Sequence, residues 1–409
     1  MSTEEKVPLM PRLRFPDFQG AEPWKAVSLG EASVPVAERV GERKLTPVSI
    51  SAGIGFIPQA AKFGRDISGN QYPLYTLVRD GDFVYNKGNS LKFPEGCAYL
   101  LQGWGEVAAP NVFICFRLKD GFSNGFFQNC FEANAHGQRL KKHITSGARS
   151  NGLLNISKAV FYGVEIPTPS SAEQQKIAAC LTSLDDLIAA QARKVSALRT
   201  HKNGLMEQLF PCKGETQPRL RFPEFREAAK WDSERLGNIA DNLDKRRIPI
   251  TSSDREFGKI PYYGASGIVD YVANFIFDED LLCISEDGAN LTARSYPIAF
   301  PISGKTWVNN HAHVLRFQNA CTQKFVEVYL NAINLDDFIT GMAQPKLNRG
   351  MLDSIPIQRP GIAEQQRIAD CLSSLGDHIT AATQELAALK THKKGLMQQL
   401  FPSAEALDA

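Results

Sequence analysis

The chain has 409 residues, 43% of them hydrophobic and 22% charged, so it is long enough to bury two or three cores and has an ordinary globular composition. Its formal net charge of +2 excludes a generally basic chain, so any surface for a polyanion must be local. No run approaches the roughly 18 apolar residues of a membrane span, and the polar start lacks a signal-peptide core, so we expect a protein without membrane association. The eight cysteines form no CxxC pair, which favours reduced thiols and a cytoplasmic protein.

The first element along the chain is a short motif, PRLRFPDF at residues 11–18, which a tryptophan follows. The motif returns as PRLRFPEF at residues 218–225, again followed by a tryptophan. We call the two copies the LRFP motifs. Because their aromatic side chains are suited to hydrophobic anchoring, we expect these motifs to attach each domain to the ends of the long helices described below rather than to take part in recognition. The aromatic residues are Phe15, Phe18 and Trp24 in the first copy and Phe222, Phe225 and Trp231 in the second.

The region that follows the first motif has the pattern of a small α+β domain. Short strand-like runs such as residues 111–118 alternate with Gly-rich turns, a helix is expected over 125–144, and a closing strand ends at Ile166-Pro167. The turn at residues 53–56 is too short for an S-adenosylmethionine loop, and neither an NPP(F/Y) nor a DPP(F/Y) motif occurs. We therefore expect a first domain, residues 1–170, without catalytic residues.

Residues 171–211 have the pattern of one long helix. Apolar residues recur at alternating steps of four and three over about five heptads, which indicates the seam of a coiled coil about 57 Å long. Ser171 with Gln174 fits a capping box, and a Phe-Pro pair ends the pattern. Gln191 and Lys202 lie on the seam, where polar residues fix the register. The predicted apolar seam positions are Ile177, Leu181, Leu184, Ile188, Leu198 and Leu205.

The second region, residues 212–361, repeats the order of the first region with a different sequence. It has a strand-like run at 312–317, a helix over 324–339 and a closing strand at Ile355-Pro356. Residues 299–306 nearly fit a phosphate-binding loop, but a strand-like stretch follows where a nucleotide site needs the start of a helix. We therefore do not interpret this run as a nucleotide site.

Two histidines of the second region are spaced like the ligands of a metal site. His311 and His313 would lie on one face of a strand, and Glu286 and Asp287 are the nearest candidates for a third ligand. The simpler interpretation is that these histidines form hydrogen bonds to a bound ligand or stabilise the domain. We predict no metal, no other cofactor and no catalytic residue in this chain.

Residues 362–402 repeat the long helix. Between residues 173–211 and 364–402, 24 of 39 positions are identical at a constant offset of 191. The two seams could pair with a second molecule or with each other, and we favour pairing within the chain because of its high effective concentration. Since the first helix leads directly into the second LRFP motif, an antiparallel pair would place one variable domain at each end, about a pseudo-twofold axis. The predicted apolar seam positions of this copy are Ile368, Leu372, Leu375, Ile379, Leu389 and Leu396, with Lys393 as a polar position.

These repeats resemble the specificity subunit of type I restriction–modification systems. The resemblance rests on the paired EQQ(K/R)IA…LM(E/Q)QLFP helices and on the LRFP motifs that alternate with dissimilar domains, and it covers about residues 11–402. Within the second region, residues 260–272, 284–291 and 305–315 resemble one recurrent type of target-recognition domain. The resemblance implies an α+β fold with two target-recognition domains separated by two long antiparallel coiled-coil helices, as a pseudo-twofold internal repeat. The domains would be 1–170, helix 171–211, 212–361, helix 362–402 and a tail, 403–409.

The same resemblance implies a function. Each variable domain would read one half of an asymmetric, bipartite sequence in double-stranded DNA, and the helices would set the unread spacer between the halves. The helices would also dock two modification (methyltransferase) subunits, and through them restriction subunits. Two other interpretations stay open: a nucleotide-dependent or metal-dependent enzyme in the second domain, and a coiled-coil scaffold whose variable ends bind proteins.

Residues for DNA contact can be proposed from clusters in turns. Phosphates attract Lys, Arg and backbone amides, while base edges are read by Arg, Asn, Gln and hydroxyl groups. A single surface Lys or Arg is more often only solvated, so clusters with interleaved Gly and Asn carry the prediction. The candidates in the first domain are Lys87, Asn89, Ser90, Lys92, Lys141, Lys142, Arg149 and Asn151. Those in the second domain are Lys245, Arg246, Arg247, Tyr262, Tyr263, Asn290, Arg294, Lys305, Asn309, Asn310, Gln344, Lys346, Asn348 and Arg349.

Overall fold

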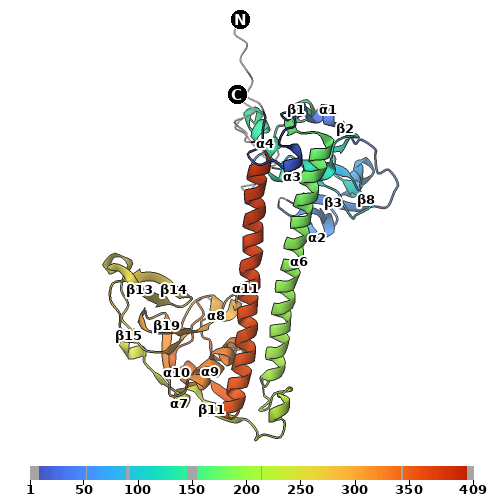
Figure 1. Ribbon diagram of the computed structural model, residues 1–409. Helices are drawn as coiled ribbons and strands as arrows, with labels where there is room; N and C mark the ends of the chain where they lie inside the picture. The colour runs from blue at the N-terminus through green and yellow to red at the C-terminus, as the bar shows by residue number, and fades with distance from the viewer. Residues whose placement is uncertain are drawn as a thin grey trace. The chain divides into compact units, whose positions relative to one another are not determined.

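The chain divides into two compact units in the computed structural model (Figure 1). Unit 1 comprises Met1–Ala190 with Leu386–Ala409, and unit 2 comprises Gln191–Glu385. The two long helices, α6 (Ser171–Leu209) and α11 (Ile362–Leu400), each contribute one part to each unit. No helix within the described part of the chain is long and apolar enough to cross a membrane. The structure describes residues 9–51, 53–88, 93–144, 154–212, 214–341 and 344–402.

The described part of unit 1 is built on two four-stranded sheets and a strand pair. The first sheet has the order β2 (Ser33–Pro35), β9 (Ile114–Leu118), β6 (Asp82–Asn86) and β7 (Cys97–Leu100). The second has the order β4 (Gly55–Pro58), β3 (Thr46–Ser51), β8 (Glu106–Ala109) and β5 (Thr76–Arg79). The strand pair is β1 (Lys25–Ser28) with β10 (Glu165–Thr168). The shorter helices are α1 (Leu29–Ala32), α2 (Gln59–Phe63), α3 (Asn124–Glu132), α4 (Ala135–Leu140) and α5 (Lys158–Tyr162).

Strand β6 is buried on both faces, because its alternating side chains enter two different cores. Phe83 points toward the helices, where its ring stacks on Phe116 at 5.3 Å and meets Phe131 of α3 at 5.4 Å. Val84 points to the other side, where it packs with Val48 and other residues of the second sheet. The first sheet is therefore the central layer of unit 1, between the helices and the second sheet.

Unit 2 repeats this topology strand for strand in the part that the structure describes. Its first sheet has the order β12 (Ala240–Asn242), β19 (Ala312–Phe317), β16 (Leu281–Ser285) and β17 (Ala299–Ile302). Its second has the order β14 (Gly267–Val272), β13 (Phe257–Gly264), β18 (Lys305–Val308) and β15 (Phe277–Asp278). The strand pair is β11 (Asp232–Arg235) with β20 (Pro356–Arg359). The shorter helices are α7 (Leu236–Ile239), α8 (Asn290–Ala293), α9 (Ala320–Ala332) and α10 (Arg349–Ser354).

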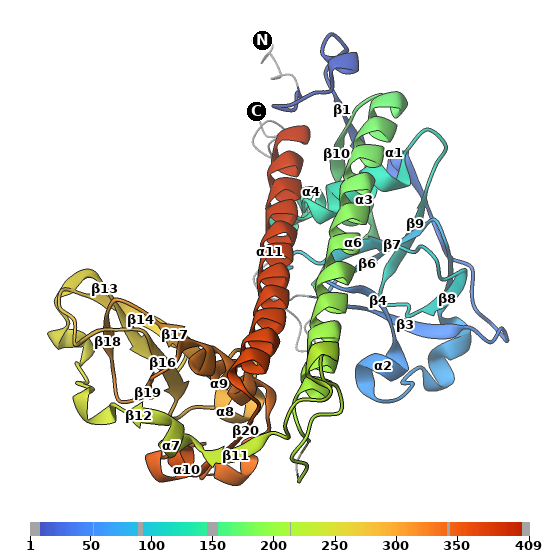
Figure 2. The ribbon, with the colours of Figure 1, turned by 60° about the horizontal axis from the view of Figure 1, so that its bottom comes forward.

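Helix α9 packs between the first sheet of unit 2 and the long helices (Figure 2). Its Phe325 contacts Trp231 and Phe210, just as Phe126 of α3 contacts Trp24 and Phe401 in unit 1. The expectation of a repeated α+β fold with two long helices is confirmed. The closing strand of the second region differs from expectation, because β20 begins at Pro356 rather than ending there.

The long helices run antiparallel within each unit. In unit 1, Lys393 of α11 lies beside Asp185 of α6, with 2.7 Å between Nζ and Oδ1. In unit 2, Gln191 of α6 donates from Nε2 to the Ala382 carbonyl at 3.0 Å and to Glu385 Oε2 at 2.8 Å. All twelve predicted apolar seam positions are buried or half-buried, and both Gln191 and Lys393 are only 7% exposed. Polar groups on the seam are thus satisfied by specific partners, which fixes the register.

The start of α6 differs from expectation. The helix begins at Ser171, but the hydroxyl that accepts from the first turn is Ser170 Oγ, which lies 3.4 Å from Glu173 N. Gln174 reaches outward instead: its Nε2 donates to the Pro169 carbonyl at 3.0 Å, and its Oε1 accepts from Ser123 N at 2.9 Å. The predicted capping box at Ser171 is therefore wrong by one residue, and Gln174 ties the helix to the start of α3.

The LRFP motifs bind the long helices through a charged residue as well as through aromatic ones. Arg14 forms a two-pronged bond to Glu173, with Nε–Oε1 at 2.8 Å and Nη2–Oε2 at 2.6 Å. In unit 2, Arg221 bonds Glu364 through the same two nitrogens. All four side chains are at most 13% exposed. Each motif is thereby fixed to the first turn of a long helix.

Candidate nucleic-acid interface

Four segments of unit 2 meet through backbone hydrogen bonds. We call them the loop cluster, and they comprise residues 263–266, 286–290, 309–311 and 344–347. Asn309 N donates to the Tyr263 carbonyl at 3.0 Å, and Glu286 N donates to the His311 carbonyl at 2.9 Å. Leu347 N donates to the Glu286 carbonyl at 2.8 Å. Because these bonds join all four segments, their outward side chains share one surface.

Amide and cationic side chains of the loop cluster face solvent. Asn310 and Gln344 are exposed, and Lys346 is exposed with its Nζ 3.2 Å from Glu286 Oε1. His311 is exposed and its Nδ1 lies 2.8 Å from Asp287 Oδ2. Amides can both donate to and accept from base edges, and a lysine suits a phosphate. The cluster therefore offers both kinds of contact that DNA recognition needs.

Several predicted contact residues are held inside unit 2. Tyr262 is 1% exposed, and its hydroxyl bonds the backbone of Ile250. Arg294 donates to the carbonyls of Leu291, Leu330 and Ile333, and burial lowers the pKa of its guanidinium. These contacts give both side chains a structural role, so we leave them out of the proposed contact set.

Other predicted residues of unit 2 are accounted for by local contacts. Arg247 bonds two carboxylates inside the unit. Asn290 is 8% exposed and bonds the backbone of Tyr296 from both ends of its amide. Asn348 caps α10, and Asn309 accepts from His311 N at 2.8 Å. These four side chains shape the turns near the interface.

The remaining predicted residues of unit 2 lie on its surface. Lys245 is exposed, and Lys305 is exposed at the start of β18, at the opposite end of that strand from Asn309, with its Nζ 4.8 Å from the centre of the Phe275 ring. Arg246 pairs with Glu279 at 2.7 Å, and Arg349 with Asp353 at 3.4 Å. Tyr263 is half-buried and stacks on Phe300.

Unit 1 has an equivalent of the loop cluster, which the structure describes only in part. Lys87 follows β6 and is half-buried, and its carbonyl accepts from Leu154 N at 2.9 Å, as Glu286 accepts from Leu347 in unit 2. Lys141 and Lys142 are exposed after α4. The other predicted residues, Asn89, Ser90, Lys92, Arg149 and Asn151, lie outside the described residues.

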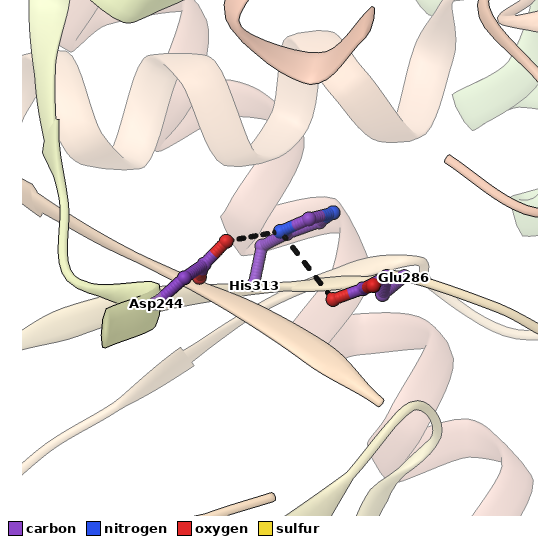
Figure 3. A group of neighbouring side chains, drawn as sticks. All are labelled: Asp244, Glu286 and His313. Atoms are coloured by element: carbon purple, nitrogen blue, oxygen red, sulfur yellow. Dashed lines mark hydrogen bonds and ion pairs between the residues drawn. The ribbon is translucent and has the colours of Figure 1, made fainter. Parts of the chain in front are cut away.

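Glu286 of the loop cluster belongs to a charged group of side chains in unit 2 (Figure 3). Asp244, Glu286 and His313 each offer a ligand atom, and these atoms lie within 4.8 Å of one another. His313 Nδ1 is 2.6 Å from Asp244 Oδ2 and 3.7 Å from Glu286 Oε2. Arg247 bonds the same carboxylates, at 2.7 Å from Glu286 Oε2 and 3.4 Å from Asp244 Oδ2. The Arg247 guanidinium already pairs with both carboxylates, so the arrangement is that of an ion-pair network rather than of a cation site.

The network keeps its carboxylates ionised. Burial by itself would raise the pKa of the Asp244 carboxyl, but the hydrogen bond from His313, the Val314 amide and the charge of Arg247 bring it below its ordinary value. Burial acts in the same direction on Glu286, and Arg247, His313 and Lys346 together lower the pKa of that carboxyl. Both groups therefore act as hydrogen-bond acceptors.

A model of the type I restriction modification DNA specificity domain matches residues 83–200 and 228–391 of the chain. The chain belongs to this family. Each matched range covers part of one variable region and part of one long helix, so the family pattern occurs twice, as the strand orders of the two units do.

Relatives of these specificity domains include a putative type I restriction enzyme specificity subunit of Haemophilus influenzae, 35% identical over 150 residues. The MjaVIII type I restriction enzyme specificity subunit of Methanocaldococcus jannaschii is 24% identical over 285 residues. The matches cover 37% and 63% of this chain, and they span 37% and 66% of the relatives' own lengths. Among solved structures, a type I restriction–modification S subunit from M. genitalium is similar in fold, with a TM-score of 0.62 and 15% identity over 97% of this chain and 100% of that chain.

The run that nearly fits a phosphate-binding loop has another structure in the second specificity domain. Residues 299–302 form β17 and residues 305–308 form β18, with Ser303 and Gly304 in the turn between them. A phosphate loop needs a helix start with free amides at that position. The rejection of a nucleotide site at residues 299–306 is therefore supported by the local geometry.

The ion-pair network of the second specificity domain is the feature that sequence reasoning missed. For His313 the sequence suggests a metal ligand or, more simply, a hydrogen-bonding residue that stabilises the domain, and for Glu286 it suggests only a ligand; Asp244 is not singled out at all. Asp244 lies 69 residues before His313, and no local pattern links the two. The Lys-Arg-Arg run that follows Asp244 was the available signal, because a buried arginine needs carboxylates near it.

Proposed function

We propose that this protein is the sequence-specific DNA-recognition subunit of a type I restriction–modification complex. Each unit would read one half of an asymmetric, bipartite target in double-stranded DNA. The long helices would set the spacer between the two halves. The observation that carries this proposal is that one topology occurs twice in one family-matched chain while equivalent loop positions hold different residues, such as Lys87 in unit 1 and Glu286 in unit 2.

The chemistry of the exposed loops supports DNA as the ligand of unit 2. Exposed Asn310 and Gln344 suit base edges, and Lys245, Lys305 and Lys346 suit phosphates. In unit 1, Lys87, Lys141 and Lys142, with the candidates outside the described residues, would play these parts. Because each good base contact discriminates by about 1–3 kcal/mol, six or seven defined base pairs in total are a reasonable target.

The chain would not catalyse a reaction itself. Methylation would belong to two modification subunits that dock on the helices, and cleavage to restriction subunits bound through them. A net charge of +2 gives the chain little general attraction for DNA, so the partners would supply much of the affinity by enclosing the duplex. The functional division of the chain would be 1–170, 171–211, 212–361 and 362–402.

Mapping of methylated adenines tests this function. Cells that carry the chain with its modification subunit are compared with cells that lack only the chain. A new gapped, asymmetric motif is the expected result and would name both half-sites. The control is a modification subunit that is shown to be active with another specificity chain. If methylation is then unchanged, the proposal is refuted and a scaffold role is favoured.

Shortening the helices separates DNA recognition from a scaffold role. Deletion of one heptad from both α6 and α11 should shorten the unread spacer while both defined blocks stay the same. A motif that loses one of its blocks, or keeps its spacer length, would contradict the role of the helices as the spacer.

A further inference from the structure

The hairpin formed by β3 and β4 of unit 1 ends in an exposed isoleucine. Ile54 is 73% exposed, more than any other large apolar side chain in the described part of unit 1. Gly53 and Gly55 flank it with φ of 81° and 96°, in the left-handed region that favours glycine. Since neither neighbour has a side chain, nothing next to Ile54 in the sequence shields it from a ligand. Single exposed apolar residues are common, so its setting decides what it can do.

The turn that carries Ile54 is held by specific bonds. Ile54 N donates to the Ser51 carbonyl at 3.0 Å, and Gly53 N donates to the Tyr99 hydroxyl at 2.7 Å. Tyr99 lies on β7 of the first sheet, so this bond ties the tip of a hairpin of the second sheet to the other layer. The isoleucine is therefore presented in a fixed place, and little ordering is needed when it meets a ligand.

The base of the same hairpin adjoins cationic residues. Asn86 Nδ2 donates to the Ile50 carbonyl at 3.1 Å, which brings the end of β6, and Lys87 after it, next to the hairpin. Lys62 is exposed, and its Nζ lies 3.4 Å from the same carbonyl. An apolar tip with lysines at its base matches the major groove of DNA, which admits a two-stranded β-ribbon and exposes base edges between two rows of phosphates.

Unit 2 has an equivalent hairpin, formed by β13 and β14. At the end of β16, Ser285 Oγ donates to the Ala265 carbonyl, as Asn86 Nδ2 at the end of β6 donates to the Ile50 carbonyl. Strands β6 and β16 have the same place in the strand orders of their sheets, and so do β3 and β13. Ala265 and Ile50 therefore mark the same point along the two hairpins.

Beyond this point the two hairpins differ in length and in chemistry. In unit 2, the two-residue turn begins at Ala265 itself and ends at Ser266. In unit 1, the strand pairing continues past Ile50, and the turn at 52–54 begins two residues later. The hairpin of unit 1 therefore reaches further by about two residues, roughly 7 Å, and presents Ile54 where unit 2 presents a hydroxyl group.

The apolar group that the major groove offers is the 5-methyl group of thymine. Resting on the proposed function, we propose that Ile54 contacts this methyl group in the block that unit 1 reads, and so determines part of the specificity of that unit. The hairpin of unit 2 would make no such contact. The two units would then read different kinds of group with the same element, which adds to the asymmetry of the target.

Removal of the methyl group from the DNA tests the contact. With the modification subunit present, affinity is measured by competition for duplexes in which each thymine of the mapped motif is replaced in turn by deoxyuridine, which lacks only that methyl group. We expect the wild-type complex to lose at least about threefold in affinity at one thymine, since the burial of a methyl group is lost. Ile54→Ala should bind the thymine and deoxyuridine duplexes equally at that position.

Two further variants serve as controls. Ile67→Ala is the matched control, because Ile67 is also exposed in unit 1, at 50%, but lies outside the hairpin. It should keep the wild-type response to deoxyuridine at every position. Ile54→Val retains a branched apolar side chain and should keep most of the response.

The outcomes separate the two proposals. If the wild-type complex prefers no motif, the proposed function fails. If it prefers a motif but no deoxyuridine position responds, or if the response persists in Ile54→Ala, the role of Ile54 is refuted. Equal weakening of Ile54→Ala on all duplexes, or loss of its binding to the modification subunit, would also refute this role, because the tip would then serve the fold or a protein partner.

Discussion

The second LRFP motif contains two arginines that differ in burial, and this difference allows a sharp test of how the motifs work. Arg221 bonds Glu364 with Nε–Oε1 at 2.9 Å, and its side chain is 13% exposed against 3% for Glu364. Arg219, two residues earlier, is 66% exposed and lies 3.6 Å from Glu215. The two pairs have the same chemistry in opposite surroundings.

Arg221→Ala should destabilise unit 2 by about 3–5 kcal/mol, because it leaves the Glu364 carboxylate buried without its partner. Arg219→Ala should cost less than about 1 kcal/mol, because water screens an exposed pair. Removing both partners, in Arg221→Ala with Glu364→Ala, should cost clearly less than the sum of the two single variants, since no unpaired buried charge remains.

Native-state hydrogen exchange of the full chain measures these effects. Amides of the β11–β20 strand pair report the opening of unit 2, and those of β1–β10 report unit 1, where Arg14→Ala should have the same effect through Glu173. Equal losses for Arg221→Ala and Arg219→Ala, or strict additivity in the double variant, would refute the view that these buried pairs attach the motifs to the helices.

Three further predictions concern other parts of the molecule. A Cβ atom added to Gly376 would lie 3.3 Å from the Lys202 ammonium, and the other long helix has Asp185 at the equivalent position. Gly376→Asp should therefore raise the free energy of unfolding of unit 2 by about 1 kcal/mol or more. Urea unfolding should show a higher midpoint, and an unchanged midpoint would contradict this prediction. Burial lowers the pKa of His136 to about 4, whereas the unfolded chain takes up this proton at a higher pH. The free energy of unfolding of unit 1 should therefore fall by about 2–3 kcal/mol as pH falls from about 6.5 to about 4. His136→Phe should remove this fall, measured as stability against pH. Asn310→Ala should relax discrimination at one position of one DNA block by about 1–3 kcal/mol in duplex competition, and uniform weakening on all sequences would mean that it contacts phosphate instead.

The sequence by itself determined the repeated organisation of this protein. A helix seam and a recurring motif are local patterns, because each depends on residues within one or two turns or a few positions of each other. The two long helices accordingly begin at Ser171 and Ile362, as their repeat predicts. The α+β character of the variable regions follows from the alternation of short runs and turns.

Only the tertiary structure decided what the charged residues do. Arg14 and Glu173 are 159 residues apart, and Asp244 and His313 are 69 apart, so no local pattern could pair them. The same clusters that predicted DNA contacts also supplied the buried Arg247 and Arg294. A charge is free for a ligand or is held inside the fold according to which distant segment packs beside it, and that packing is set by the whole chain rather than by the residues on either side.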